Sequence, residues 1–195
     1  VNPKKALVAG DSFTEGTGAT AQGSGYATRL SEISGNFNLV VSGSGGTGYV
    51  ATNNGRPNLE TRAQTDIVDQ SPDIVIIAMG INDSLDITSA VTNTVDTIQT
   101  GLPNATIVLV GSWTAGEATG QMITNTAIIE SVANSKGVYF INPTGTANGD
   151  GWVTGTGNDG NLQGDGNADI FVSSDGTHPN DAGHEFHAQR LYNSL

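Results

Sequence analysis

The sequence has no cysteine and very few basic residues. Without cysteine the chain can form neither disulfide bonds nor thiolate–metal sites. Only 7 of the 195 residues are Lys or Arg, against 19 Asp and Glu, which gives a formal charge of -12. Nucleic acids are bound through cationic side chains that neutralise their phosphates, and anionic membranes attract the same groups. We therefore expect neither a nucleic acid nor an anionic membrane as a partner.

Long apolar runs and dense charge are also missing. No apolar run approaches the roughly 18 residues of a membrane-spanning helix, and no signal peptide is visible, so membrane insertion is not expected. Charged residues make up only 13% of the chain, so its surface has to be built largely from Thr, Ser, Asn and Gly. This acidic, lysine-poor composition favours an extracellular or virion-associated location. The length predicts one domain spanning residues 1–195.

Five short apolar runs rich in β-branched residues predict strands that are buried on both faces. These runs are 6–9, 38–41, 74–78, 107–110 and 138–141. Segments with apolar residues at helical spacing alternate with the runs and predict helices at 26–34, 59–70, 89–100, 119–135 and 180–193. Asn180 is the expected N-cap of the last helix. Alternating strands and helices predict a parallel sheet covered by helices on both faces.

Ser12 is the candidate nucleophile. It lies in Gly10-Asp11-Ser12-Phe13, directly after the first predicted strand, where open α/β sheets place their sites. A serine hydroxyl needs a base, and His178 is the candidate base. Asp175 precedes that histidine by three residues on a turn made easier by glycine, so its carboxylate can meet the imidazole ring. Alone, Gly-Asp-Ser is equally typical of an ordinary strand-to-helix turn.

Two other predicted strands are followed by candidate hydrogen-bond donors. Asn82 comes just after 74–78, where its amide can donate to a developing oxyanion or, alternatively, cap a helix. The stretch 42–49 contains four glycines, which let backbone N–H groups approach a ligand closely. It spells G-x-G-x-x-G, but no helix is predicted to follow at once and no Gly-Lys-Ser/Thr is present. Neither a dinucleotide site nor a phosphate-binding loop is therefore favoured.

Four motifs in this order resemble the four blocks of the SGNH/GDSL hydrolase family of serine esterases, lipases and acetylesterases. They are Gly10-Asp11-Ser12, a glycine after the second strand, Gly80-x-Asn82-Asp83 and Asp175-x-x-His178-Pro179. The resemblance spans nearly the whole chain. It implies an α/β fold, namely a three-layer α/β/α sandwich with a flavodoxin-like five-stranded parallel sheet. Phe13 stands where the family motif has leucine, a position without a catalytic role.

The resemblance also implies the roles of individual residues. Ser12, His178 and Asp175 would form the catalytic triad. The oxyanion hole would consist of the Ser12 amide, a glycine amide after the second strand and the Asn82 side chain. Among the competing glycines, Gly46 fits best because Gly-Thr after a small residue matches the family block. No metal and no organic cofactor is implied.

The predicted function is ester hydrolysis through an acyl-enzyme intermediate. The polar, acidic composition without an apolar lid favours O-deacetylation of a carbohydrate, so the expected partner is a small-molecule or polysaccharide ester. One alternative is a short-chain lipid or aryl esterase. Another is a non-catalytic glycan-binding module that keeps the same fold.

Three aromatic residues are the candidate substrate contacts: Trp152, Trp113 and Tyr49. Trp152 is the only large aromatic residue in the glycine-rich stretch 142–166, which has no predicted helix or strand. This stretch leaves from the carboxyl end of a predicted strand and is expected to pass over or beside the nucleophile. There the indole would stack on a sugar ring. Alternatively, it fills a small core of its own.

A cation site and a pair of histidines complete the candidates. The stretch 158–169 is rich in Asp and Asn and is a candidate calcium loop, although Ile170 replaces the glutamate that an EF-hand has at its twelfth position. His184 and His187 lie three residues apart on the last predicted helix. They lack the H-E-x-x-H spacing of a zinc site and are expected on a solvated or half-buried face.

Overall fold

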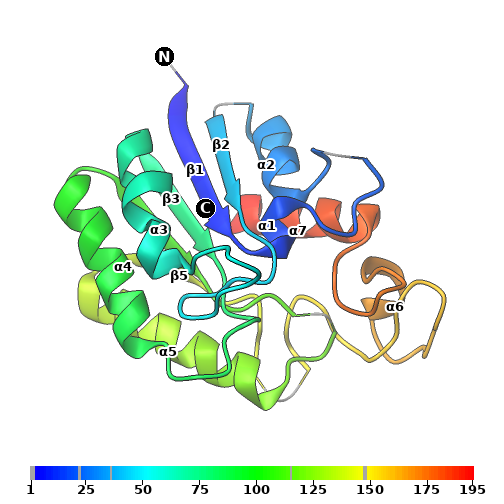
Figure 1. Cartoon of the computed structure of the whole chain (residues 1–195). Helices are drawn as coiled ribbons and strands as arrows, with labels where there is room; N and C mark the ends of the chain where they lie inside the picture. The colour runs from blue at the N-terminus through cyan, green and yellow to red at the C-terminus, as the bar shows by residue number, and fades with distance from the viewer. Residues whose placement is uncertain (1–2, 22, 36, 115, 147–148) are drawn as a thin grey trace.

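The computed structural model describes residues 3–21, 23–35, 37–114, 116–146 and 149–195. Five parallel strands form one sheet in the order β2-β1-β3-β4-β5 (Figure 1). The strands are β1 (Lys4–Gly10), β2 (Phe37–Gly43), β3 (Ile74–Ala78), β4 (Thr106–Val110) and β5 (Tyr139–Ile141). This is the flavodoxin-like strand order, so the predicted sheet is confirmed.

Helices fill the connections between the strands. They are α1 (Ser12–Glu15), α2 (Tyr26–Ser34), α3 (Leu59–Asp66), the 3₁₀ helix η1 (Val68–Gln70), α4 (Thr88–Gly101), α5 (Gly120–Lys136), α6 (Ala168–Phe171) and α7 (Asp181–Ser194). α3, α4 and α5 cover one face of the sheet, and α2 and α7 cover the other (Figure 1). The molecule is therefore the three-layer sandwich that the sequence predicts.

Side chains alternate between the two cores along the central strands. Leu7 of β1 and Ile77 of β3 pack with the helices of the first face, whereas Val8 and Ile76 pack with those of the second. Because both faces are buried, these strands are nearly continuous apolar runs. The edge strands differ from the prediction of complete burial. Tyr139 of β5 is 70% exposed, because the covering layers do not enclose the sheet edges.

The predicted helix 59–70 is interrupted. α3 ends at Asp66, Ile67 caps it with φ -116° and ψ -62°, and η1 follows. The last helix agrees with its prediction, because the Asn180 side chain caps α7 by accepting a hydrogen bond from Gly183 N at 2.9 Å. α1 and α6 are not predicted, since helices of four residues are too short to show apolar periodicity.

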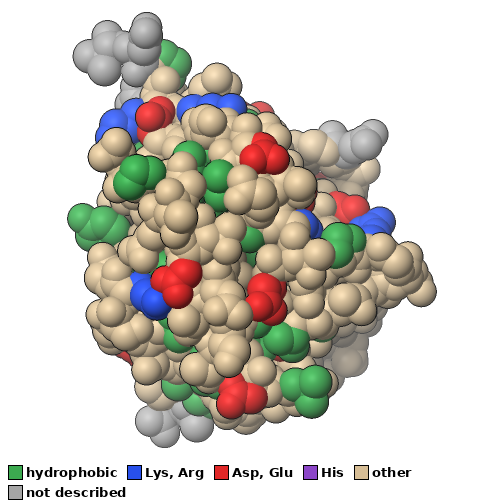
Figure 2. Space-filling view, turned by 60° about the vertical axis from the view of Figure 1, so that its left-hand side comes forward, with side chains coloured by type: hydrophobic (Ala, Val, Ile, Leu, Met, Phe, Trp, Pro, Cys, Tyr) green, Lys and Arg blue, Asp and Glu red, His purple; other side chains and the backbone are tan. Residues whose placement is uncertain are grey.

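The surface has the uncharged polar character that the composition predicts. On the face shown in Figure 2, acidic and basic side chains are scattered and most of the area is backbone or uncharged polar side chain. Among the described residues, no helix combines the length and the apolar character needed to cross a membrane.

Candidate active site

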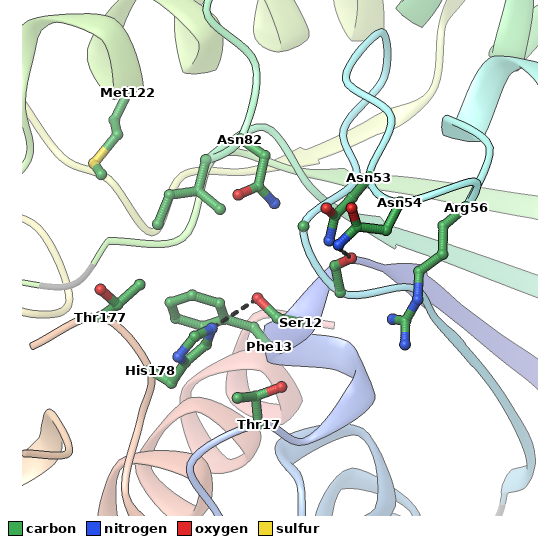
Figure 3. A pocket seen from close by; sticks show the side chains of 13 residues that line it. Ser12, Phe13, Thr17, Asn53, Asn54, Arg56, Asn82, Met122, Thr177 and His178 are labelled. Atoms are coloured by element: carbon green, nitrogen blue, oxygen red, sulfur yellow. Dashed lines mark hydrogen bonds between the residues drawn. The ribbon is translucent and has the colours of Figure 1, made fainter. Parts of the chain in front are cut away.

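The carboxyl ends of three neighbouring strands bring the predicted motifs together. Ser12 follows β1 as the first residue of α1, Gly46 lies in the turn after β2, and Asn82 lies in the turn after β3. With His178 they line one open cavity of about 710 Å³ (Figure 3). The four motifs, which are far apart in the sequence, therefore meet in one site.

The turn from β1 into α1 positions the serine. Asp11 caps α1, with its Oδ1 accepting a hydrogen bond from Phe13 N at 3.0 Å. Gly10 has to lack a side chain, because a Cβ there would lie 2.0 Å from Thr14 Oγ1 and 2.5 Å from the carbonyl oxygen of Ala78. As the first helical residue, Ser12 has a backbone N–H without an intrahelical acceptor.

Ser12, His178 and Asp175 form a hydrogen-bonded line. His178 Nε2 lies 2.9 Å from Ser12 Oγ, and His178 Nδ1 lies 2.7 Å from Asp175 Oδ2. A carboxylate can only accept, so Nδ1 donates to it and Nε2 is left to accept the serine proton. The other oxygen, Asp175 Oδ1, accepts from Thr177 N, His178 N and Ser173 Oγ at 2.8–2.9 Å.

These hydrogen bonds decide the charge of Asp175. Partial burial by itself would raise the pKa of this carboxyl group. The bonds from the His178 backbone and ring, and from Thr177 and Ser173, outweigh burial and hold the pKa well below its ordinary value. The group is therefore an anion at neutral pH, able to hold the His178 ring and to stabilise its protonated form.

The structure distinguishes among the four glycines after the second strand. Gly43 is part of β2, Gly45 N donates to Glu15 Oε2 at 2.9 Å, and Gly48 N donates to the carbonyl of Ala51 at 2.9 Å. Among the described residues, no acceptor is found for the amide of Gly46. This is the glycine selected from the family block, and its amide is available for an oxyanion.

The Asn82 side chain has one N–H group available to donate to a ligand. Its Nδ2 donates one hydrogen bond to the carbonyl oxygen of Thr47, at 2.9 Å. A side-chain amide carries two N–H groups, so one remains for a ligand. The bond also ties the turn after β3 to the loop after β2. The donor role in an oxyanion hole stays a prediction that this geometry permits.

Two buried charged residues hold this region together, and neither of them was assigned a role from the sequence. Asp83 accepts hydrogen bonds from the backbone amides of Tyr49, Val50 and Ala51 at 2.8–3.0 Å, which anchors the segment after the glycine loop. Arg62 is only 5% exposed and donates to the carbonyl oxygen of Gly10 at 2.8 Å. An arginine among the apolar positions of α3 is the signal that could have indicated such a role.

Asp11 is completely buried beneath the nucleophile. Burial raises its pKa to about 7, and the nearby carboxylate of Asp83 acts in the same direction. Near neutral pH, Asp11 is therefore protonated in a substantial fraction of molecules. This limits the buried negative charge next to Ser12.

The prediction that Trp152, Trp113 and Tyr49 contact substrate is wrong, because all three are buried and none lines the cavity. Trp113 is 1% and Trp152 7% exposed, and their ring centres lie 5.6 Å apart. The Arg190 guanidinium lies 5.2 Å from the centre of the Trp152 ring. The stretch 142–166 thus packs Trp152 into the core beside α7, which is the alternative considered from the sequence.

The expected environment of the two helical histidines is also wrong. His184 is completely buried, with Nδ1 accepting from Tyr26 N at 3.1 Å and Nε2 lying 3.0 Å from the carbonyl oxygen of Thr17. His187 is 2% exposed, and burial lowers its pKa to about 3. α7 is covered by α2 and by the long stretch before it, so this face is not solvated.

Two carboxylates of the candidate calcium loop accept hydrogen bonds from within the same stretch of chain. Asp165 accepts hydrogen bonds from Thr156 N and Oγ1, and Asp169 accepts from the amides of Gln163 and Gly164. Within the ranges that the structure describes, no group of three or more His, Asp or Glu residues is arranged to hold a metal ion. The oxygen-rich composition is explained by the turns that these side chains stabilise.

The flavodoxin-like sheet and the Ser–His–Asp line at its carboxyl edge are what the resemblance to the SGNH/GDSL hydrolase family implies. The chain belongs to the GDSL-like lipase/acylhydrolase family, whose family model matches residues 8–186. Membership of this family thus supports an esterase or hydrolase activity. No curated protein matches the chain in sequence.

Solved structures of esterases share the fold over nearly the whole chain. A family 3 carbohydrate esterase from Clostridium thermocellum is 21% identical, with a TM-score of 0.73 and coverage of 98% of this chain and 94% of that one. A catalytic mutant of Axe2, an acetylxylan esterase from Geobacillus stearothermophilus, is 19% identical, with a TM-score of 0.70 and coverage of 100% and 95%. At these identities the likeness establishes the fold.

Proposed function

We propose that this protein is a serine ester hydrolase that removes acetyl groups from carbohydrates. The observation that carries the proposal is the hydrogen-bonded line from Asp175 through His178 to Ser12, with distances of 2.7 and 2.9 Å, at the edge of an open cavity. A nucleophile, a base within hydrogen-bond reach and an orienting carboxylate are the groups that acyl transfer requires.

The reaction follows from the position of each group. Ser12 Oγ attacks the ester carbonyl carbon while His178 Nε2 takes its proton, and Asp175 stabilises the imidazolium ion. The amides of Ser12 and Gly46 and the Asn82 side chain donate to the oxyanion. The tetrahedral intermediate collapses as His178 protonates the departing alcohol. Water then attacks the acyl-enzyme in the same way and releases the acid.

The lining of the cavity supports a hydrated substrate. Asn53, Asn54, Thr17 and Thr177 surround the serine with hydrogen-bonding groups, as a sugar with its many hydroxyls requires. The two solved esterases described above are named for acetylxylan and carbohydrate substrates. These likenesses add weight to a carbohydrate ester.

A second candidate is a short-chain lipid or aryl esterase. Its support is the apolar part of the same lining, formed by Phe13, Ile81 and Met122. These side chains can receive the hydrocarbon part of a small ester. Because the cavity is open to water, it would leave much of a long acyl chain exposed, so a long chain fits less well than a short one.

The experiment combines labelling with two series of substrates. A fluorophosphonate should label Ser12, and the Ser12→Ala variant should remain unlabelled. The wild type should release acetate from acetylated xylan more efficiently than it hydrolyses p-nitrophenyl esters of increasing chain length. Efficient turnover of butyrate or longer esters without acetate release would favour the second candidate. Failure to label and to turn over either series would leave the glycan-binding module.

A further inference from the structure

A tight hairpin carries an arginine to one rim of the cavity. Asn53 N donates to the carbonyl of Arg56 at 3.2 Å, and Arg56 N donates to that of Asn53 at 2.8 Å. Between them, Asn54 and Gly55 have φ values of +46° and +81°, as a two-residue turn of type I′ requires. Figure 3 shows Asn53, Asn54 and Arg56 on the opposite side of Ser12 from Met122.

The guanidinium of Arg56 is held at one corner only. Its Nη1 donates to both carboxylate oxygens of Glu15, at 3.1 and 3.0 Å, and Glu15 is itself fixed by the amide of Gly45. Among the described residues, Nε and Nη2 have no hydrogen-bond acceptor. This edge of a guanidinium presents two parallel N–H groups, the geometry that binds a carboxylate with two hydrogen bonds. Arg56 is also the one Lys or Arg among the described residues that line the cavity.

The arginine lies close to the nucleophile. A Cβ placed on Gly45 would be 3.2 Å from Arg56 Nη1 and 3.6 Å from Ser12 Cβ, so this single glycine separates the two side chains. Nη1 is the corner that Glu15 binds, and the free edge formed by Nε and Nη2 lies beyond it, so a sugar residue whose acetyl group lies at Ser12 has to extend another of its substituents past Nη1 to meet this edge. The amide of Asn54 lies on the same rim and offers a further hydrogen bond.

We propose that Arg56 and Asn54 bind the carboxylate of an acidic sugar, so that the preferred substrate is an O-acetylated uronic acid residue. This inference rests on the proposed deacetylase function and specifies its substrate class. The net charge of -12 repels anions at long range, but salt screens that field beyond about 8 Å. A contact at Arg56 therefore selects the bound sugar without attracting it from a distance.

The test uses a matched pair of substrates: an O-acetylated methyl glycoside of a uronic acid, and the same compound with its carboxylate masked as a methyl ester. The wild type should prefer the free acid by about tenfold in kcat/KM, mainly through KM, with a smaller preference at high salt. Arg56→Gln should abolish the preference, and Arg56→Lys should keep part of it, because lysine retains the charge without the two-pronged geometry.

Arg29→Gln is the matched control. Arg29 is half-buried and forms an ion pair with Glu185 at 2.8 Å, away from the cavity, so the variant makes the same change in net charge. It should keep the wild-type preference. If this variant also lost the preference, the preference would be an effect of overall charge and not of a local contact, and the inference would be overturned.

The remaining outcomes are separable. Equal kcat/KM for the acid and the ester in the wild type would overturn the inference and leave the deacetylase function intact. An equal fall of kcat on both sugars and on p-nitrophenyl acetate in Arg56→Gln would also overturn it, because Arg56 would then act by holding Glu15 and the glycine loop. A wild type inactive on all three substrates would overturn the proposed function together with the inference.

Discussion

Two glycine-rich stretches, 42–48 and 142–166, are alike in composition and different in use. In the first, neighbouring groups occupy the space that side chains would need. A Cβ on Gly45 would lie 2.4 Å from Glu15 Oε2, and one on Gly46 would lie 2.2 Å from Asn53 Nδ2. These glycines let the backbone come close to the nucleophile's helix and to the hairpin of Arg56. The short loop thus brings Gly46, whose amide has no acceptor among the described residues, to the cavity.

The second stretch uses some of its glycines only to turn, although others, such as Gly157 and Gly166, also lie against neighbouring atoms. Gly160 and Gly164 have φ values of +99° and +72°, and a Cβ on either would meet no atom within 4 Å. The stretch forms successive turns fastened by Asp carboxylates, and it buries Trp152. Glycine content therefore does not locate the site. Contact with the cavity does, because Gly45 and Gly46 line it, whereas none of the described residues of 142–166 does.

Removal of the base should have the largest effect on kcat and should not alter the packing of the stretch 142–166. His178→Ala should lower kcat by about a thousandfold or more, because the serine then has no proton acceptor. Adding Ser12→Ala should cost little further, since the residues act as a unit. Kinetics with p-nitrophenyl acetate and thermal melts would measure both effects. Additive losses in the double variant, or wild-type turnover in either single one, would contradict the triad.

Trp152→Ala should lower stability and leave activity nearly unchanged. We expect a loss of about 3–5 kcal/mol in the free energy of unfolding, as for other buried aromatic residues. Urea denaturation would measure it, and kcat of the folded protein should change little. Leu162→Ala is the control from the same stretch. Its side chain is 70% exposed, so the stability should stay within about 0.5 kcal/mol of the wild type. Unchanged stability of Trp152→Ala, with a raised KM for a glycan ester, would return this residue to the binding site.

Asn82→Ala should lower kcat by about 10²–10³ and change KM little, which is the usual effect of losing one oxyanion donor. The control is Asn58→Ala. Asn58 caps α3 by accepting from Thr61 N at 3.0 Å, so its loss should cost about 1 kcal/mol of stability and leave kcat unchanged. A change confined to KM in Asn82→Ala would show that this residue positions substrate instead.

The smallest effect concerns His187, which lies in the core around Trp152. Its folded-state pKa of about 3 is below the value of about 6.5 in an unfolded chain, so the native state binds fewer protons between these limits. Stability should therefore fall as the pH drops below about 6.5, with a loss of about 2 kcal/mol by pH 5 from this group. The acid side of the stability profile should be flatter for His187→Phe. Parallel wild-type and variant profiles would contradict a neutral buried imidazole.

The central strands and the four motifs are predictable from the sequence because their causes are local. A strand buried on both faces has to be a continuous apolar run, and the motif residues follow such runs directly. The family block singles out Gly46, but the contacts that occupy the amides of Gly45 and Gly48 are not predictable, because they depend on where Glu15 and Ala51 lie in the fold. The course of 142–166 is not predictable either, since packing against α7 decides it. The extracellular or virion-associated location stays a prediction from composition.

The bond between His178 Nε2 and Ser12 Oγ joins residues that are 166 positions apart in the chain. During synthesis on a ribosome, the proposed nucleophile Ser12 and the glycine loop 42–48 emerge early, whereas the proposed base His178 emerges only with the last tenth of this sequence. A nascent or prematurely terminated chain can therefore expose the serine without being able to activate it. Appearance of esterase activity should thus report that synthesis of the region around His178 is complete and that α7 has docked.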